Sequence, residues 1–339
     1  MFRRWPLLVG LWSMISSAGC LPSHDSELVV YTALDREFSA PILDDFSAET
    51  GVAVLPKYDV ESTKTVGLVN AIMQEANRPR CDVFWNNEIL HTLRLQEQGL
   101  LEAYQSPQAE QFPANYRSPD GYWYGFAARA RVLVVNTEIL SEDERPSSIH
   151  DLADEKWKGR AGIAKPLFGT TATHAAVLFA RWGEERGKEF FRQVYGNVEV
   201  LSGNKQVAVA VGRGQLAFGI TDTDDAIVEI EKGLPLAIVY PDQGDGELGT
   251  LFIPNTLCII RGAPNPENAH RLLDYLLTPD VEVRLARGAS AQFPLHVAGD
   301  EQPRVYQDGI RHMEVDFPAA ADQWDSAAEF LRDVYAAAD

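Results

Sequence analysis

Apolar and polar residues follow one another along the chain as short strand-like runs and amphipathic helical stretches. The run at 28–32 is rich in β-branched and aromatic residues and predicts a first strand. Residues 35–49 then place Phe38, Ile42 and Phe46 on one face of a predicted helix. The same order of strand and helix recurs at short intervals, which is typical of an α/β layer with a largely parallel sheet.

Two long apolar runs interrupt this order. Residues 125–136 read as a long strand, and a second series of strands and helices follows it. Residues 249–260 begin another long apolar strand. We interpret both runs as crossings between two lobes. The first lobe is then expected to contain residues 28–130 and 251–339, and the second lobe residues 131–250.

The N-terminus has the features of an export signal. Arg3 and Arg4 precede a short apolar run that ends in small residues and Cys20. This ending resembles a bacterial lipoprotein signal, which predicts a signal peptide at 1–19, lipidation of Cys20 and a tether at 20–27. A signal that is cleaved without lipidation is the alternative.

The composition is that of a globular chain, with 45% hydrophobic and 23% charged residues. The formal charge of −19 argues against nucleic acid as a partner. Cys81 and Cys258 lie in apolar, strand-like runs, and their spacing fits no metal site. We expect both to be small buried residues, although they could pair in an oxidising compartment.

An acidic stretch stands where a predicted strand is followed by a predicted helix. The strand ends with residues 215–218, and Asp222, Thr223, Asp224 and Asp225 come shortly after it. Side chains at the end of a strand and amides at the start of a helix converge on one point, which is a common place for a ligand. Capping of the helix is the alternative, but it accounts for one or two of these residues only.

A second candidate region has the chemistry of an anion site. Thr170, Thr171 and Thr173 stand at the start of a predicted helix, where hydroxyl groups and free backbone amides can face one anion. Arg129 and Arg131 lie on the same face of the long strand, and a guanidinium binds an oxyanion through two hydrogen bonds. Ordinary helix capping and salt bridges between the lobes are the alternatives.

Several stretches match one known family in consistent order over roughly residues 28–295. The run Asp151–Arg160, with the sequence DLADEKWKGR, is the most specific of them. The others are residues 30–32, 81–85, 98–101, 125–132 and 272–279. In these stretches the chain resembles the periplasmic ferric-iron-binding proteins of ABC importers, which belong to the type II solute-binding superfamily. The resemblance implies two α/β lobes, each with a mixed sheet flanked by helices, a two-strand hinge, and a ligand in the cleft between the lobes.

The chain departs from this family at the metal ligands. Iron binders of the family carry adjacent tyrosines where this chain has Asp222 and Thr223. The family's ligands from the first lobe map near Asp35 and near Asn87 or Glu88. The resemblance therefore implies an all-oxygen set, consisting of Asp35, Glu88, Asp222 and Asp224. Carboxylates suit hard cations such as ferric iron, and they would also hold an amine.

The resemblance also implies an anion that completes the coordination of the metal, such as phosphate or carbonate. The threonine-rich helix start and the two arginines match the region that holds this anion. Asn204 matches a further family position beside it, although the Gly-Asn pair is also typical of a turn.

We therefore expect a monomeric, extracytoplasmic solute-binding lipoprotein that serves an ABC permease and touches the membrane through its lipid only. The expected cargo is ferric iron, or another hard cation, with an anion. A phosphonate or another organic anion or zwitterion is the alternative cargo. A hydrolytic enzyme that uses Asp222 and Asp224 is the alternative function, but the usual motifs of nucleophilic, metalloprotease and nucleotide-binding sites are missing. A sensor domain would have the same sequence features.

Overall fold

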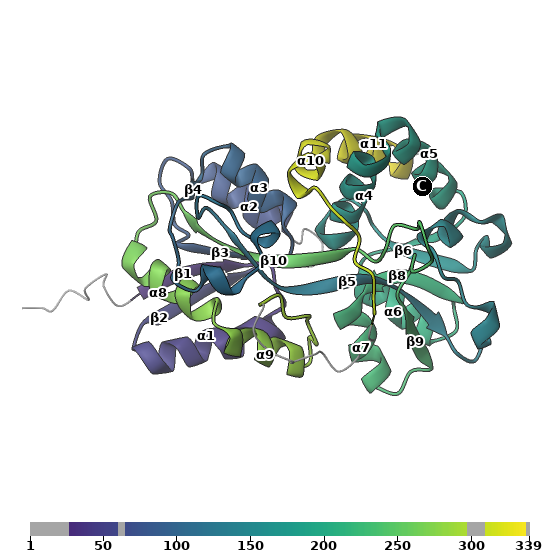
Figure 1. Ribbon diagram of the computed structural model, residues 1–339, viewed down its shortest axis with the longest axis horizontal. Helices are drawn as coiled ribbons and strands as arrows, with labels where there is room; N and C mark the ends of the chain where they lie inside the picture. Colours follow the sequence, from purple (N-terminus) through teal and green to yellow (C-terminus); the bar gives the residue numbers. More distant parts are fainter. Residues whose placement is uncertain (1–26, 60–64, 297–308, 337–339) are drawn as a thin grey trace, which may run out of the picture.

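The computed structural model describes residues 27–59, 65–296 and 309–336 (Figure 1). The predicted signal peptide, Cys20 and the tether up to residue 26 lie outside the described residues. The strands are β1 (Glu27–Thr32), β2 (Ala53–Tyr58), β3 (Val83–Asn86), β4 (Leu101–Glu102), β5 (Tyr124–Asn136), β6 (Ala161–Ala164), β7 (Glu199–Leu201), β8 (Phe218–Asp222), β9 (Leu236–Val239) and β10 (Phe252–Ile260).

Helices alternate with these strands. In the first half of the chain they are α1 (Arg36–Thr50), α2 (Val66–Gln74), α3 (Leu90–Glu97), α4 (Gly169–Trp182) and α5 (Glu184–Tyr195). The second half adds α6 (Asn204–Gly212), α7 (Thr223–Glu231), α8 (Pro266–Leu276), α9 (Pro279–Arg287), α10 (Phe317–Asp322) and α11 (Trp324–Ala336).

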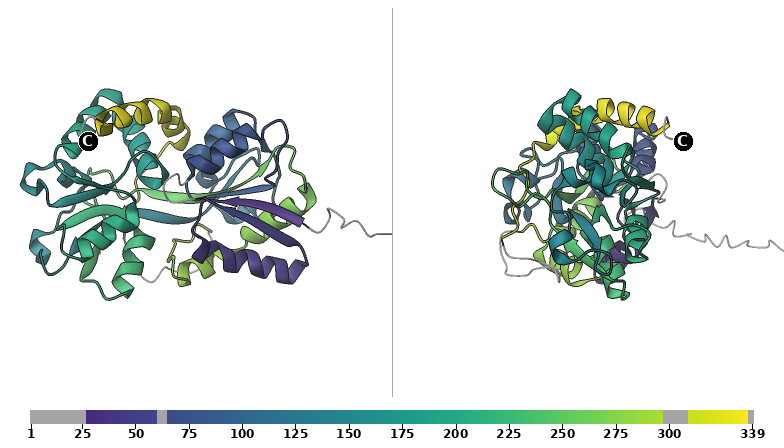
Figure 2. Two further views of the ribbon diagram at one scale, coloured as in Figure 1. Left: turned by 180° about the vertical axis from the view of Figure 1, so that it is seen from behind. Right: turned by 90° about the vertical axis from the view of Figure 1, so that its right-hand side faces the viewer.

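The strands lie in the order β2-β1-β3-β10-β5-β8-β6-β7, with β4 on β10 and β9 on β5. In the first lobe β1 is parallel to β2 and β3, whereas β10 is antiparallel to β3. In the second lobe β6 is parallel to β7 and β8, whereas β5 is antiparallel to β8. Each lobe therefore has a mixed sheet, and helices lie on both faces of each sheet (Figures 1 and 2).

Strand β5 joins the two lobes. Up to Ala130 it pairs with β10, and from Arg131 onward it pairs with β8. The sequence analysis divides the lobes at this same position. All residues of β5 are buried, which explains the mostly apolar run around Arg129 and Arg131 that predicts a long strand.

The pairing between the two crossing strands, β5 and β10, is irregular at one position. The register between β5 and β10 shifts at Pro254 and Asn255, and Ala127 is the extra residue opposite this shift, with a φ of 44°. Buried Glu282 of α9 accepts a hydrogen bond from the amide of Ala127 at 2.5 Å. A bulge bends a strand locally, so β5 is bent at this position.

The C-terminal helices differ from the expectation that residues 251–339 belong to the first lobe. Helices α8 and α9 do pack on that lobe, but α10 lies between α3 and α4, and α11 lies on α4 and α5 of the second lobe (Figure 1). Ala327 and Leu331 of α11 are buried in the core of the second lobe. The apolar stripe of α11 therefore covers the second lobe.

Cys81 and Cys258 are buried in the core of the first lobe and are not joined by a disulfide. They are small buried residues, as expected. Within the described ranges, no helix is both long enough and apolar enough to span a bilayer.

Candidate functional site

One pocket lies where the two lobes meet. The first lobe contributes Asp35 and Asn87, and Arg129 reaches it from β5. The second lobe supplies the other lining residues, which are Ala164, Lys165, Phe168, Gly169, Thr170, Thr171, Gly203, Asn204, Asp222, Asp224 and Asp225. The pocket thus brings together most of the residues that the sequence analysis selected as ligand-binding.

The starts of four helices line this pocket. Helices α4, α6 and α7 begin there from the second lobe, and Asp35 precedes α1 of the first lobe. None of these four helix starts has a side-chain cap. The backbone N–H groups of a first helical turn have no partner inside the helix and carry partial positive charge. The pocket therefore contains positive potential in addition to its charged side chains.

The second-lobe wall of the pocket contains a buried ion pair. Arg131 is 1% exposed and donates a hydrogen bond to Oδ1 of Asp222 at 2.7 Å. The other oxygen of Asp222 accepts hydrogen bonds from Thr170 at 2.5 Å and from Asn204 at 2.9 Å. Burial alone would raise the pKa of Asp222, but Arg131 and Arg129 outweigh it and hold this pKa below its usual value.

Arg129 is the guanidinium that lines the pocket. Its Nη1 lies 3.5 Å from a carboxylate oxygen of Asp224 and 4.0 Å from one of Asp222. Its Nη2 donates to the backbone carbonyl of Asn87, so this side chain contacts both lobes. Burial would lower the pKa of Arg129, but the two carboxylates hold it above its usual value. Among the described residues, its buried Nε has no hydrogen-bond partner.

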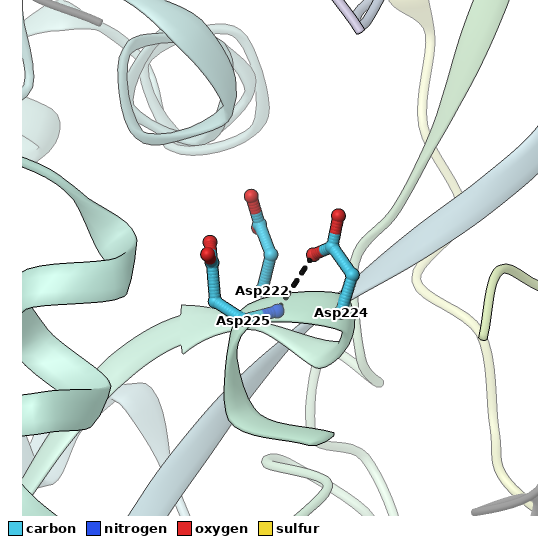
Figure 3. Close-up of side chains that lie close together, drawn as sticks. All are labelled: Asp222, Asp224 and Asp225. Carbon is cyan, nitrogen blue, oxygen red and sulfur yellow. Dashed lines mark hydrogen bonds between the residues drawn. The ribbon is translucent and has the colours of Figure 1, made fainter. Parts of the chain in front are cut away.

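Three carboxylates stand together at the end of β8 and the start of α7 (Figure 3). One oxygen each of Asp222, Asp224 and Asp225 lies within 4.8 Å of the other two. Asp224 also accepts a hydrogen bond from the amide of Asp225 at 3.1 Å. A cation placed among these oxygens would be held by hard, anionic ligands, as a hard metal ion or an ammonium group requires.

Four residues selected from the sequence lie beside the pocket rather than in it. Arg131 lies behind Asp222, and the hydroxyl of Thr223 accepts a hydrogen bond from the amide of Ala130 at 3.2 Å. Thr173 donates to Glu88 at 3.1 Å. Glu88 itself accepts from the amide of Leu90 at 2.6 Å. The carboxylate of Glu88 therefore binds the first amide of α3 and a hydroxyl of α4, and it is not among the residues that line the pocket.

Six pocket residues lie outside the sequence-based selection, namely Ala164, Lys165, Phe168, Gly169, Gly203 and Asp225. Asp225 belongs to the same acidic stretch as Asp224, so its neighbours were a sufficient signal. Lys165 and Phe168 follow strand β6 and precede α4. Residues in a strand-to-helix connection next to an anion-binding helix start are candidates on position alone, and this is the signal that could have found them.

The geometry can be compared with known proteins. A family model described as bacterial extracellular solute-binding protein matches residues 91–316. The chain belongs to this family. The membership confirms a solute-binding protein with an extracytoplasmic role, and it excludes the hydrolytic alternative because the family binds solutes rather than transforming them.

The relatives of this solute-binding protein include iron uptake protein A1 of Synechocystis, which is 28% identical over 78% of this chain and 75% of the relative. The fold matches that of iron-bound HitA from Pseudomonas aeruginosa with a TM-score of 0.81, at 21% identity over 91% of this chain and 99% of HitA. It also matches AfuA from Actinobacillus pleuropneumoniae, crystallised with fructose-6-phosphate, with a TM-score of 0.78 at 24% identity over 89% and 96% of the two chains. These matches confirm the two-lobed, type II fold.

The solute-binding protein is expected to lose stability in acid through His174. This residue of α4 is buried near Arg131, and burial, together with Arg131, lowers its pKa to about 3. The unfolded chain takes up a proton near pH 6.5 while the folded protein does not. Stability should therefore fall as the pH falls from about 6.5 towards 3, by at most about 1.4 kcal/mol per pH unit.

His174→Gln should flatten this dependence by roughly 2 kcal/mol between pH 7 and pH 4.5. Urea unfolding of both proteins at the two pH values measures the difference. His150→Gln, at an exposed histidine, is the matched control. Equal losses of stability in the wild type and in His174→Gln would contradict the expectation.

Proposed function

We propose that the protein is the solute receptor of an ABC importer and binds a hard metal ion, ferric iron in the first place, together with a small anion. The observation that carries this proposal is the pocket between the lobes, in which carboxylates face uncapped helix starts and a buried arginine.

Four carboxylates line the cation side of this pocket: Asp35, Asp224 and Asp225, with Asp222 behind them in the buried ion pair with Arg131. Their oxygens are hard, negatively charged ligands, and ferric iron is a hard cation that prefers such ligands. The choice of ferric iron over other hard cations is supported by relatives such as iron uptake protein A1 and iron-bound HitA.

The anion side consists of Arg129, Lys165 and the first turn of α4. A phosphate or carbonate there would receive hydrogen bonds from backbone amides and from a guanidinium. It would also neutralise part of the positive charge that the helix starts and the basic side chains bring to the pocket. An anion and a metal ion bound side by side would together neutralise the positively charged groups and the carboxylates of the pocket.

The lining residues come from both lobes, and this supports closure of the two lobes on a bound ligand. Asp35 and Asn87 come from the first lobe, and the α4, α6 and α7 starts come from the second. A ligand held by both sets of residues stabilises the arrangement in which the lobes approach one another. A closed lobe arrangement is the form that a permease can distinguish from the unliganded one.

A second candidate cargo is an organic oxyanion or zwitterion, such as an aminophosphonate or a phosphorylated sugar. No tyrosine is among the described residues that line the pocket, so the phenolate ligands of typical family members are replaced by carboxylates. Carboxylates accept hydrogen bonds from ammonium or hydroxyl groups, while Arg129 and the helix starts would hold the phosphorus oxyanion. The fold match to AfuA with fructose-6-phosphate supports this alternative.

A thermal-shift panel separates the two cargoes. Ferric nitrilotriacetate should raise the melting temperature, and more so with phosphate or carbonate, because a ligand that binds only the folded state stabilises it. Arg129→Gln should remove the additional effect of the anion. A shift with aminophosphonates or sugar phosphates and none with ferric iron would favour the second cargo. No shift with any of these probes would refute the proposed site.

We further infer that the protein is held at the membrane by a lipid on Cys20. Cys20→Ser should move the protein from the membrane fraction to the soluble periplasmic fraction, because one diacylated cysteine is the only predicted contact with the bilayer. Fractionation and immunoblotting measure the distribution, and Cys81→Ser is the matched control. Membrane retention of Cys20→Ser would argue against the anchor.

A further inference from the structure

Asp222 lines the ligand pocket, yet the protein itself already occupies both of its carboxylate oxygens. Oδ1 accepts from Arg131 at 2.7 Å, and Oδ2 accepts from Thr170 at 2.5 Å and from Asn204 at 2.9 Å. The side chain is 2% exposed. A metal ion that bound Asp222 would have to displace donors that this buried carboxylate needs, which is costly.

The ion pair is part of the strand register. Arg131 and Asp222 are direct partners across β5 and β8, where β5 enters the second lobe. Residues opposite one another in an antiparallel pair have their side chains on the same face of the sheet. The pair therefore forms whenever β8 pairs correctly with β5, with or without a ligand.

This pair also ties together the starts of three helices. Thr170 lies in the first turn of α4, Asn204 is the first residue of α6, and Asp222 immediately precedes α7. Arg131 completes the network, because it donates to the side-chain oxygens of Asn204 at 3.0 Å and of Thr171 at 3.2 Å. The second-lobe wall of the pocket is thus held in one arrangement by a single buried network.

We propose that Asp222 is a positioning residue rather than a metal ligand. It fixes the α4, α6 and α7 starts through Arg131, Thr170 and Asn204, and it neutralises the charge of Arg131. The cation is then held by Asp35, Asp224 and Asp225, with the anion at Arg129. The identity of the cation rests on the proposed function, whereas the positioning role of Asp222 does not.

Three variants test this assignment. Asp222→Asn leaves Arg131 buried without its counter-charge, and we expect the melting temperature of the ligand-free protein to fall by roughly 5–10 °C. Arg131→Gln combined with Asp222→Asn replaces the ion pair by two neutral amides, and it should recover most of this loss. Asp225→Asn removes a pocket carboxylate that is less buried than Asp222, and it should change the melting temperature by at most about 2 °C.

Ligand binding distinguishes positioning from ligation. Calorimetry with ferric nitrilotriacetate and with inorganic phosphate is applied to all variants. The Arg131→Gln/Asp222→Asn protein should retain ferric affinity within about tenfold of the wild type, whereas Asp225→Asn should lose about a hundredfold. Asp222→Asn alone should bind phosphate about tenfold more tightly, because the charge of Arg131 is then uncompensated, and the added Arg131→Gln change should reverse this gain.

These experiments distinguish a failure of the assignment of Asp222 from a failure of the proposed function. A loss of ferric affinity in the double variant as large as that in Asp225→Asn would make Asp222 a metal ligand and overturn the assignment. A phosphate gain that Arg131→Gln does not reverse would overturn it as well. If the wild type does not bind ferric iron, the proposed cargo fails, and the recovery of melting temperature and the reversal of the phosphate gain still decide the role of Asp222.

Discussion

Replacing Glu88 with alanine is expected to lower the free energy of unfolding by about 3–5 kcal/mol without removing a metal ligand. The Glu88 side chain is fully buried. It accepts hydrogen bonds from Asn86 at 2.7 Å, from the Leu90 amide at 2.6 Å and from His91 Nδ1 at 3.1 Å. Alanine would remove the acceptor of the Leu90 amide and of His91 Nδ1, and Asn86 Nδ2 would keep its hydrogen bond to Thr92 at 3.3 Å.

Two milder variants divide this loss into parts. Glu88→Gln keeps one carbonyl oxygen and should cost roughly 1–3 kcal/mol, because the negative charge at the start of α3 is lost. Thr173→Val removes the hydroxyl that lies 3.1 Å from Glu88 of the first lobe and 3.2 Å from the carbonyl of Gly169 in its own helix, and should cost at most about 1.5 kcal/mol. Urea unfolding at pH 7 measures all three, and ferric binding by calorimetry is the second measurement.

The pH dependence of this contribution has a definite sign. Burial would raise the pKa of Glu88, but the His91 ring and hydrogen bonds from His91 and Asn86 outweigh it and hold this pKa below its usual value. The contribution should therefore be fully present above the unfolded pKa near 4.5 and be lost as the pH falls through the lower folded value. A Glu88→Ala protein that kept its stability but lost ferric binding would instead identify Glu88 as a ligand.

The sequence predicts much of this fold because its main signals are local. The run of β5 is long and mostly apolar since the strand is buried in both lobes, and its length alone predicts a crossing. The acidic stretch around Asp224 and the threonines around Thr170 mark helix starts, and strands of one sheet bring such starts to one edge. The pocket could therefore be assembled from chain positions before any contact was known.

The remaining features depend on contacts that the sequence does not encode locally. Arg129 and Arg131 lie on one face by alternation, but β5 exchanges β10 for β8 between Ala130 and Arg131. Only Arg131 then stands opposite Asp222, and only Arg129 lines the pocket. Charge and spacing alone predict the same role for both arginines.

The packing of the C-terminal helix α11 likewise depends on contacts that the sequence does not encode locally. The apolar stripe of α11 predicts that the helix is covered on one side, but both lobes offer a complementary surface. Ala327 and Leu331 are buried among residues of the second lobe, while Trp324 contacts the ring of His91 in α3 at 4.2 Å between centroids. Which surface α11 covers depends on tertiary contacts rather than on its own periodicity.

Replacing both Asp224 and Asp225 with asparagine is expected to weaken ferric binding by at least about a hundredfold, which corresponds to roughly 3 kcal/mol or more. Both residues line the pocket, and one carboxylate oxygen of each lies within 4.8 Å of the other, so that one cation can contact both. Asparagine preserves the shape of each side chain and removes its charge. A trivalent ion loses far more than a neutral solute does when two anionic ligands become neutral.

The stability of this double variant should change much less than its affinity. Asp224 has Arg129 as its partner at 3.5 Å, but Arg129 keeps its contacts with Asp222 and with the carbonyl of Asn87. We expect a loss of about 1–2 kcal/mol, because the weakened repulsion among the three carboxylates offsets part of the broken ion pair. Urea unfolding and calorimetry on the same preparation measure stability and affinity together.

A matched control is available at the start of α5. Glu184 and Glu185 are exposed acids in the first turn of that helix and lie far from the pocket lining. Glu184→Gln/Glu185→Gln removes the same number of charges from the same kind of helix position, so the overall charge of the protein and the helix-start effect are both reproduced. Ferric affinity should remain within about threefold of the wild type in this control. If the two double variants bound ferric iron equally well, the carboxylates of α7 would not hold the cation, and the organic oxyanion would become the better-supported cargo.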